Sequence, residues 1–487
     1  MKRMRAIGLF VALCSAWGVA DAGDVVVDGL LVSNGGGVMF PDGSVQNSAA
    51  HPRWKRIAYV DPHGDGDYTD PATAMADLGT WCPGASTLEP CLVKVLPGDY
   101  DVGTTPVVMH PGVDLEGSGR NTTFIRGAVP GISTGLVVLS SFSEVRSVTL
   151  INNGTGAANA VGIFSSSADP FVEDVLVYVS GASDVNAGIR SLDGIPTIRR
   201  TNVQVVGGTT CYGVWTSDAA PLMDQTEVWT DNESGVQNFG MVMSGSAAPR
   251  LRQVRVQAGG GDQVTGIFMD VPFATVESSR VRAQSTGTAN VRGIVSDGGL
   301  HRLTDCRVEA WGGNYATGIT TENGSNAAIV GGEVGVRDAS IYTTGILIDG
   351  SSPLLQSTRV EVSGAEYALG IRSASSSAPT LRLVTAEAWD ATTYTYGVYN
   401  ESGSTLEATG LVVTASSAGG SYGVLNTSTG GAVSVDRCTV EGGNTSVRND
   451  NSSAEFGVGN SKLIGPVTAN LTCFGNHDGS YAAVSCP

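Results

Sequence analysis

The sequence predicts an all-β protein folded as a right-handed parallel β-helix, a solenoid of at least twelve coils of 25 to 27 residues. Three observations predict this fold. A glycine recurs at that interval, an aliphatic residue or methionine follows each such glycine, and short alternating runs lie between them. A fixed period of this length is typical of a solenoid, whose repeats bury their apolar sides by stacking on one another. The recurring glycines are Gly135, Gly162, Gly188, Gly213, Gly240, Gly266, Gly293, Gly318, Gly345, Gly370, Gly397 and Gly423.

The segments between these glycines have the pattern of β-strands. After Gly188-Ile-Arg comes the turn Ser191-Leu-Asp-Gly-Ile-Pro, followed by Thr197-Ile-Arg-Arg-Thr-Asn-Val-Gln-Val-Val-Gly-Gly. Apolar and polar residues alternate with period two, and no helical stripe longer than a turn interrupts them. Parallel strands without crossover helices require a coil, with neighbouring coils about 4.8 Å apart. The recurring glycine suits a tight corner or a close approach of the backbone.

The N-terminus has the features of a secretory signal peptide, predicted for residues 1–22. Three basic residues precede a mainly apolar stretch at 6–20, and Ala20-Asp21-Ala22 offers a cleavage site. No later stretch approaches about 20 apolar residues, so no transmembrane span is expected. The sequence therefore predicts a secreted, extracellular or cell-surface protein, with the periplasm as an alternative location.

The rest of the chain divides into four predicted parts. Residues 23–56 contain Phe40-Pro-Asp-Gly-Ser-Val-Gln, similar to a segment of bacterial secreted proteins and phage fibres, and predict a hairpin with a Pro-Asp-Gly turn. This segment is a candidate association element. Residues 57–134 form the cap and opening coils, with a short helix from about Asp70. Residues 135–460 are the repeat β-helix, and residues 461–487 are a C-terminal tail.

The charge balance excludes two classes of partner. Loss of the signal peptide removes three basic residues and one acidic residue, which changes the formal net charge from −18 to −20. Nucleic acids and anionic membranes both need cationic contacts, so neither is an expected partner. An acidic polysaccharide is also repelled unless metal ions or local arginine clusters intervene.

Seven cysteines remain after cleavage of the signal peptide. Cys82 with Cys91, and Cys473 with Cys486, are predicted to form local disulfides at the two ends of the solenoid, as an oxidising compartment permits. Three others fall inside repeats at spacings that suit no metal site, so we expect small buried side chains there. They are Cys211, Cys306 and Cys438.

Three short motifs carry a family resemblance. They are Gly64-Asp-Gly-Asp-Tyr-Thr, Pro97-Gly-Asp-Tyr, and Gly117-Ser-Gly followed by Thr-Phe-Ile-Arg-Gly127. With the architecture of residues 57 to 460, they resemble the pectin-lyase-like right-handed β-helix superfamily, and the first resembles the start of pectin methylesterases. This resemblance implies a parallel β-helix and, in its enzymes, action on polysaccharides. The catalytic signatures of polygalacturonases and methylesterases are missing, so no catalytic residue can be assigned.

One outward face of the coils supplies candidate ligand-binding residues. Taking Val256 and Ala283 as members of one inward row places Arg255 and Arg282 in one outward row, and Gln257 beside Gln284. Trp311 and Trp389 then lie three coils apart, about 14 Å, where indole rings could stack on sugars or simply lie on a solvated face. The candidates are Trp311, Trp389, Arg255, Arg282, Glu309, Glu361 and Glu387.

Two carboxylate patterns are candidates for chemistry. Glu361 and Glu387 should lie about 5 Å apart, the separation found in retaining glycosidases, although any two adjacent coils give that spacing. Four other acidic residues each follow a recurring glycine by four residues, where they are either solvated or bridged by Ca²⁺, the one cofactor considered. These are Asp270, Asp297, Glu322 and Asp349.

The preferred function is that of a secreted, non-catalytic structural or adhesive β-helix, with carbohydrate as the candidate ligand. One alternative is a divergent polysaccharide lyase, hydrolase or esterase, so enzyme activity is left open. The constant intervals from Gly135 to Gly423 disfavour it, because enzymes usually interrupt coils with long loops around a cleft. The other alternative is a trimeric fibre or tailspike-like adhesin, a homo-oligomer held by the segment before residue 57.

Overall fold

The computed structural model describes residues 54–487 except 234, 469, 481 and 485–487, together with four short strands before residue 54. The chain divides into one unit at residues 1–55 and a second at residues 56–487. No helix in the described part is both long enough and apolar enough to span a bilayer. The predicted signal peptide, residues 1–22, lies outside the described residues, so secretion stays a prediction.

The first unit is a small antiparallel sheet with strand order β1-β2-β3-β4. The strands β3 and β4 pair with Val38 opposite Gln46, as expected for a hairpin at the Phe-Pro-Asp-Gly segment. The turn itself, residues 40–44, lies outside the described residues, and a role in association stays a prediction. The bounds are β1 (Val25–Val27), β2 (Leu30–Ser33), β3 (Gly37–Met39) and β4 (Val45–Gln46).

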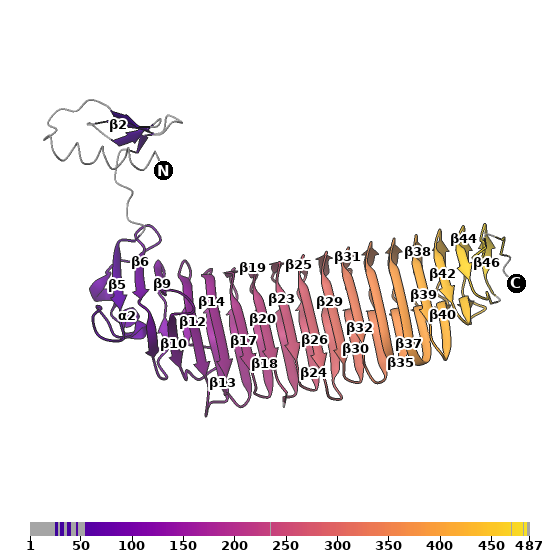
Figure 1. Cartoon of the computed structure of the whole chain (residues 1–487), viewed down its shortest axis with the longest axis horizontal. Coiled ribbons are helices and arrows are strands. Elements are labelled where there is room, and N and C mark those ends of the chain that lie inside the picture. Colours follow the sequence, from indigo (N-terminus) through magenta and orange to yellow (C-terminus); the bar gives the residue numbers. More distant parts are fainter. Residues whose placement is uncertain are drawn as a thin grey trace. The chain divides into compact units, whose positions relative to one another are not determined.

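The second unit is a parallel β-helix of about 14 turns, in which successive coils stack strand beside strand (Figure 1). The predicted fold class and the fold implied by the family resemblance are therefore confirmed. Three parallel sheets run along the stack. Each coil from β6 to β43 contributes one strand to each sheet in the order sheet 1, sheet 2, sheet 3, and β5, β44, β45 and β46 belong to incomplete coils at the two ends. The long strands β12, β14, β35 and β37 each bend across two sheets.

Sheet 1 consists of β5 (Arg56–Val60), β6 (Cys91–Val95), β9 (Val113–Glu116), the first parts of β12 (Glu144–Asn153) and β14 (Phe171–Ser180), β16 (Thr197–Arg199), β19 (Leu222–Asp224), β22 (Arg250–Arg252), β25 (Phe273–Glu277), β28 (Leu300–Thr304), β31 (Ala328–Val330), β34 (Leu354–Gln356), β36 (Thr380–Arg382), β38 (Leu406–Thr409), β41 (Val433–Asp436), β44 (Phe456–Gly459) and β46 (Thr472–Phe474). Sheet 2 consists of β7 (Gly98–Asp101), β10 (Thr123–Gly127), the second parts of β12 and β14, β17 (Asn202–Val206), β20 (Glu227–Asp231), β23 (Arg255–Gly259), β26 (Arg280–Ser285), β29 (Arg307–Gly312), β32 (Glu333–Arg337), the first parts of β35 (Arg359–Ala374) and β37 (Thr385–Asn400), β39 (Val412–Ser416), β42 (Thr439–Gly442) and β45 (Lys462–Ile464). Sheet 3 consists of β8 (Val107–Val108), β11 (Val137–Leu139), β13 (Asn159–Ser166), β15 (Val185–Leu192), β18 (Thr210–Ser217), β21 (Gln237–Ser244), β24 (Gln263–Asp270), β27 (Asn290–Asp297), β30 (Tyr315–Glu322), β33 (Tyr342–Asp349), the second parts of β35 and β37, β40 (Gly420–Asn426) and β43 (Thr445–Asn449).

All the recurring glycines except Gly135 lie within strands of sheet 3, where their backbone closely approaches sheet 2. A Cβ atom on Gly213 would lie 2.2 Å from Cγ1 of Val228 and 2.5 Å from the carbonyl oxygen of Gly240. The same valine-and-carbonyl contact recurs at most of the other glycines in the row. Close approach, rather than a tight corner, therefore explains the period, because only glycine leaves room for the facing valine.

The cap at the start of the second unit also agrees with the sequence. Helix α2 (Pro71–Ala76) begins after Asp70, whose carboxylate accepts a hydrogen bond from the Thr73 amide at 2.8 Å, and α3 (Leu78–Trp81) follows. The predicted Cys82–Cys91 disulfide is present. Cys486, the predicted partner of Cys473, lies outside the described residues, so that disulfide stays a prediction.

The core is a continuous column of inward valine, leucine and isoleucine side chains along the coils. The three remaining cysteines are free and buried within it, as expected. Burial raises the pKa of the Cys211 thiol to about 12, and those of Cys306 and Cys438 to about 11. Protonated, buried thiols of this kind act as small apolar side chains.

Candidate functional site

The outward face of sheet 2 carries the predicted ligand-binding residues, in three parallel rows that we call the tryptophan face. The first row is Glu227, Arg255, Arg280, Arg307, Glu333 and Arg359. The middle row is Trp229, Gln257, Arg282, Glu309, Gly335, Glu361 and Glu387. The third row is Gln284, Trp311, Arg337, Ser363 and Trp389.

One part of the predicted register is wrong. Arg255 pairs with Arg280 and not with Arg282, and Gln257 pairs with Arg282 and not with Gln284. The reason is that Val256 packs against one recurring glycine and Val281 packs in the same way against the next. These two valines therefore share one row. Because strand side chains alternate with period two, a slip of two residues keeps every outward residue outward and leaves no trace in the pattern.

Three arginines converge on one carboxylate at the centre of this face. Nε of Arg282 donates to Glu309 Oε2 at 2.6 Å, Nε of Arg307 donates to Oε1 at 2.9 Å, and Nη2 of Arg280 reaches Oε1 at 3.1 Å. Burial acts to raise the pKa of Glu309, but the hydrogen bonds from these guanidinium groups outweigh burial and hold the pKa below its usual value. One anion thus anchors three cations, leaving a local excess of positive charge.

The two predicted tryptophans bound a hollow of about 350 Å³ beside this cluster. Trp311 and Trp389 lie three coils apart in one row, as predicted, and both are partly exposed. Arg337 and Ser363 occupy the two positions between them in the third row, and Gly335 lines the hollow from the middle row. The guanidinium of Arg337 lies 5.6 Å from the centre of the Trp311 ring. The complete lining is Arg307, Glu309, Trp311, Gly335, Val336, Arg337, Glu361, Ser363 and Trp389.

The predicted carboxylate pair is also present, but it is engaged with an arginine. Glu361 and Glu387 are direct neighbours on β35 and β37. Arg359 places Nε 2.6 Å from Glu361 and Nη2 3.2 Å from Glu387, and these two negative charges raise the pKa of Arg359. The pair therefore has the form of a shared ion pair and lacks the two distinct environments that separate an acid from a base in glycosidases.

The predicted acidic row lies at the end of the sheet 3 strands. Asp297, Glu322 and Asp349 pair in register on β27, β30 and β33, and Asp270 ends the preceding strand β24. Burial raises the pKa of Glu322, and Asp297 and Asp349 add to this shift against an opposing effect of Arg292. Among the described residues, no group of three or more His, Cys, Asp or Glu side chains gathers as a metal site, and Ca²⁺ binding stays a prediction.

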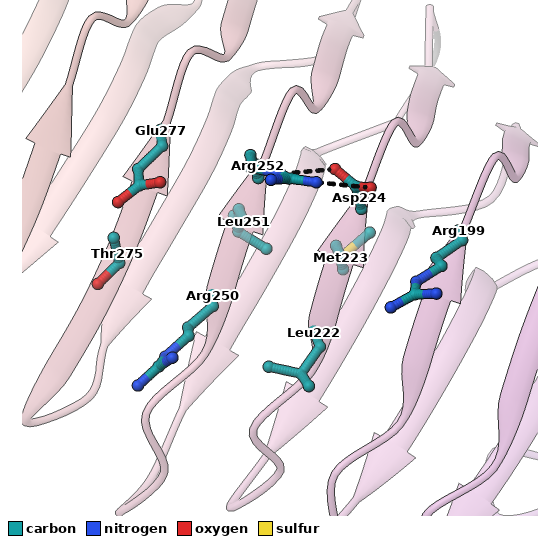
Figure 2. A pocket seen from close by; sticks show the side chains of 9 residues that line it. All are labelled: Arg199, Leu222, Met223, Asp224, Arg250, Leu251, Arg252, Thr275 and Glu277. Atoms are coloured by element: carbon teal, nitrogen blue, oxygen red, sulfur yellow. Dashed lines mark hydrogen bonds and ion pairs between the residues drawn. The ribbon is translucent and has the colours of Figure 1, made fainter. Parts of the chain in front are cut away.

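A second hollow, of about 340 Å³, lies on sheet 1 and is lined by charged and apolar side chains. Figure 2 shows Arg252 reaching from its strand to Asp224 on the neighbouring strand, with Nε–Oδ1 and Nη2–Oδ2 distances of 2.9 and 3.1 Å. The hydrogen bond from Arg252 lowers the pKa of Asp224. The residues around it are Arg199, Leu222, Met223, Arg250, Leu251, Thr275 and Glu277, without an aromatic ring for stacking on a sugar.

Sequence reasoning missed a row of tyrosines on sheet 3. Tyr315, Tyr342, Tyr367 and Tyr394 pair in register along four coils, and neighbouring rings stack. A signal for this row was present in the sequence, because each tyrosine precedes its recurring glycine by three residues. Equal offsets from a periodic landmark place side chains in one row.

Comparisons with known proteins found solved structures of low similarity. No family model and no curated protein matches the chain. The A-module of mannuronan C-5 epimerase AlgE6 from Azotobacter vinelandii is 14% identical, with 85% of this chain and 94% of that chain covered and a TM-score of 0.33. Pectin methylesterase from carrot is 13% identical, covering 54% and 84%, with a TM-score of 0.36. The Dettilon tailspike protein is 11% identical, covering 82% and 70%, with a TM-score of 0.38. At these identities, no site residue is transferred from those proteins.

Proposed function

We propose that this protein is an exported, non-catalytic β-helix that binds an acidic polysaccharide along the tryptophan face. The observation that carries the proposal is the hollow between Trp311 and Trp389, set beside the arginines around Glu309. Indole rings stack on the apolar faces of sugars, and arginine forks bind carboxylate or sulfate groups.

The spacing along the solenoid suits a polymer. Two rings three coils apart are separated by about 14 Å, which exceeds one sugar ring and requires an extended chain to contact both. Gly335 in the middle row and Ser363 in the third row leave the hollow open, while Arg337, which lies between Trp311 and Ser363, offers a guanidinium group to the chain. The tryptophan face therefore favours several linked sugars over a single one.

The local charge favours an acidic chain. From Glu227 to Arg337, the three rows hold five arginines and three glutamates, on a protein of net charge −18. The side chains of Arg280, Arg282 and Arg307, which share Glu309, are 37%, 37% and 55% exposed. Guanidinium groups that share one carboxylate retain donors for a further anion, which a carboxylate or sulfate on the glycan would supply.

The ion pairing of the acidic residues on this face favours binding without cleavage. Each of its five glutamates is within 4 Å of an arginine nitrogen, in ion pairs that immobilise it. A general acid and a general base need two carboxyl groups held in contrasting environments, an arrangement that these ion pairs do not favour. The constant coil length over the repeat region supports the same conclusion.

A binding screen on the mature chain tests this proposal. Polyuronates and sulfated polysaccharides are compared with neutral polymers, with and without Ca²⁺, for the wild type and a Trp311→Ala/Trp389→Ala double variant. Trp215→Ala is the matched control, because it removes a partly exposed indole from β18 of sheet 3, away from the tryptophan face. We expect acidic polymers to bind the wild type and the control but not the double variant. Equal binding by all three proteins, or no binding by any, would contradict the proposal.

A further inference from the structure

The tyrosine row on sheet 3 ends in a ring with one uncovered face. Ring centres are 5.8 Å apart between Tyr315 and Tyr342, 4.7 Å between Tyr342 and Tyr367, and 6.1 Å between Tyr367 and Tyr394. The two inner rings are stacked on both sides. Tyr315 is stacked only on the side of Tyr342, and 44% of its surface is exposed.

A hollow of about 640 Å³ opens at this free end of the tyrosine row, which we call the tyrosine hollow. Asn290 pairs with Tyr315 on the preceding strand, so the short amide leaves room where a further ring would otherwise stack. The lining consists of Gln263, Asn290, Val291, Arg292, Tyr315, Thr317, Tyr342, Thr344, Leu347 and Arg372. It combines one aromatic face with amides and hydroxyls that donate and accept hydrogen bonds, the combination used to bind sugars.

The charges in the tyrosine hollow are already compensated. Arg372 Nη2 lies 2.6 Å from a carboxylate oxygen of Glu401, and Arg292 Nη1 lies 4.0 Å from Glu322. This differs from the tryptophan face, where three arginines share Glu309. A compensated hollow gains little from an anion, because an added carboxylate would compete with Glu401 for Arg372 and would lie close to the negative charge of Glu322. Its polar groups are better matched to hydroxyls.

We propose that the tyrosine hollow is a second carbohydrate site, which binds an uncharged pyranose sugar stacked on Tyr315. This inference concerns a different sheet and a different ligand class, and it does not depend on the tryptophan face binding anything. The two sites lie on the same coils, with only residues 312–314 between Trp311 and Tyr315. A polysaccharide with acidic and neutral residues could thus contact the protein on both sides of one corner.

The test uses neutral hexaoses of glucose, mannose and xylose, with a hexauronate as the charged comparator, titrated into the full mature chain. Calorimetry gives Kd, and ligand-observed saturation-transfer NMR detects weak binding. Tyr315→Ala removes the stacking face, and Tyr315→Phe retains it. Tyr394→Ala is the matched control, a 38% exposed ring at the other end of the row. Thermal unfolding shows whether each variant remains folded.

We expect at least one neutral hexaose to bind, with affinity reduced roughly tenfold by Tyr315→Ala and little changed by Tyr315→Phe or Tyr394→Ala. The Trp311→Ala/Trp389→Ala variant should retain this binding, which separates the tyrosine hollow from the proposed function. Three outcomes would overturn the proposal: absence of neutral hexaose binding, equal losses for Tyr315→Ala and Tyr394→Ala, or displacement of the neutral sugar by the hexauronate. If the tryptophan variant alone loses neutral binding, the sugar binds at the tryptophan face, which also overturns it.

Discussion

Gly188 lies against Val203 so closely that a Cβ atom at position 188 would be 2.1 Å from Cγ1 of the valine. The carbonyl oxygen of Gly213 on the next coil would be 2.6 Å from the same atom. Both neighbours are held in place, one by core packing and the other by the backbone of sheet 3. The contact joins sheet 3 of one coil to sheet 2 of the coil that follows, and it repeats along the solenoid.

We therefore expect Gly188→Ala to destabilise the protein by about 2 to 3 kcal/mol, the usual effect of overpacking a core. The midpoint of urea unfolding measures it. Gly457→Ala on β44 is the matched control, because no atom lies within 4 Å of its added Cβ and its backbone is not left-handed. That variant should unfold at the wild-type midpoint or slightly above it, since alanine favours the folded strand over glycine. Equal effects at both positions would contradict the close-approach explanation of the glycine period.

The period is also why the fold could be predicted from the sequence. The close approach to sheet 2 recurs once per coil and requires a glycine each time. Glycines such as Gly188 and Gly213 therefore recur at a nearly constant interval, whatever residues make up the rest of the coil. The helix after Asp70 and the Cys82–Cys91 disulfide were predictable for a similar reason, because each depends on residues close in the chain.

The candidate site was less predictable, because it depends on register between coils. Trp311 and Trp389 were correctly placed in one row, but Arg255 was assigned to the wrong row by a slip of two residues. The ion pairs of Glu361 and Glu387 with a shared arginine also depend on how far side chains extend between neighbouring strands. The alternation of polar and apolar residues carries no information about this.

His301 is buried within the core and hydrogen-bonded at both ring nitrogens. Its Nε2 lies 2.7 Å from the carbonyl oxygen of Val271, and its Nδ1 lies 2.6 Å from Oγ of Ser296. Nε2 must therefore carry the proton, while Nδ1 accepts from the serine hydroxyl. Burial lowers the pKa of His301, against opposing effects of the Val271 hydrogen bond and of Asp297 and Asp270.

A pH dependence of stability follows from His301. Below the ordinary histidine pKa of about 6.5, the imidazole of His301 binds a proton in the unfolded chain but not in the folded protein. The free energy of unfolding should therefore fall as pH drops. The slope from this one group is at most about 1.4 kcal/mol per pH unit. Urea midpoints at pH 7.5 and 5.5 measure it. His301→Gln should show a smaller decrease than the wild type, and an unchanged decrease would show that other groups cause it.

The floor of the tryptophan hollow offers a way to close it without disturbing the fold. Gly335 lines the hollow from the middle row, between Glu309 and Glu361, and no atom lies within 4 Å of an added Cβ. We expect Gly335→Leu to retain the wild-type unfolding midpoint while weakening acidic polysaccharide binding at least tenfold, because the side chain would fill part of the hollow beside the rings. The control is Gly457→Leu, an equally open position far along the solenoid. Retained binding by Gly335→Leu would place the ligand elsewhere.

The arginines around Glu309 predict how binding should respond to salt. A polyanion that contacts several guanidinium groups releases counterions, so its affinity falls as ionic strength rises, and the slope grows with the number of contacts. Arg282 is 37% exposed and shares its carboxylate with two other arginines, so it retains donors for the ligand. We expect Arg282→Gln to weaken acidic polysaccharide binding several-fold at low salt and to reduce the slope of log K against log salt concentration. Arg252→Gln on sheet 1 is the matched control, since it also removes an exposed, ion-paired arginine and should leave the affinity and the slope unchanged. Wild-type affinity that is independent of salt would indicate that stacking on the tryptophans, and not charge, holds the ligand.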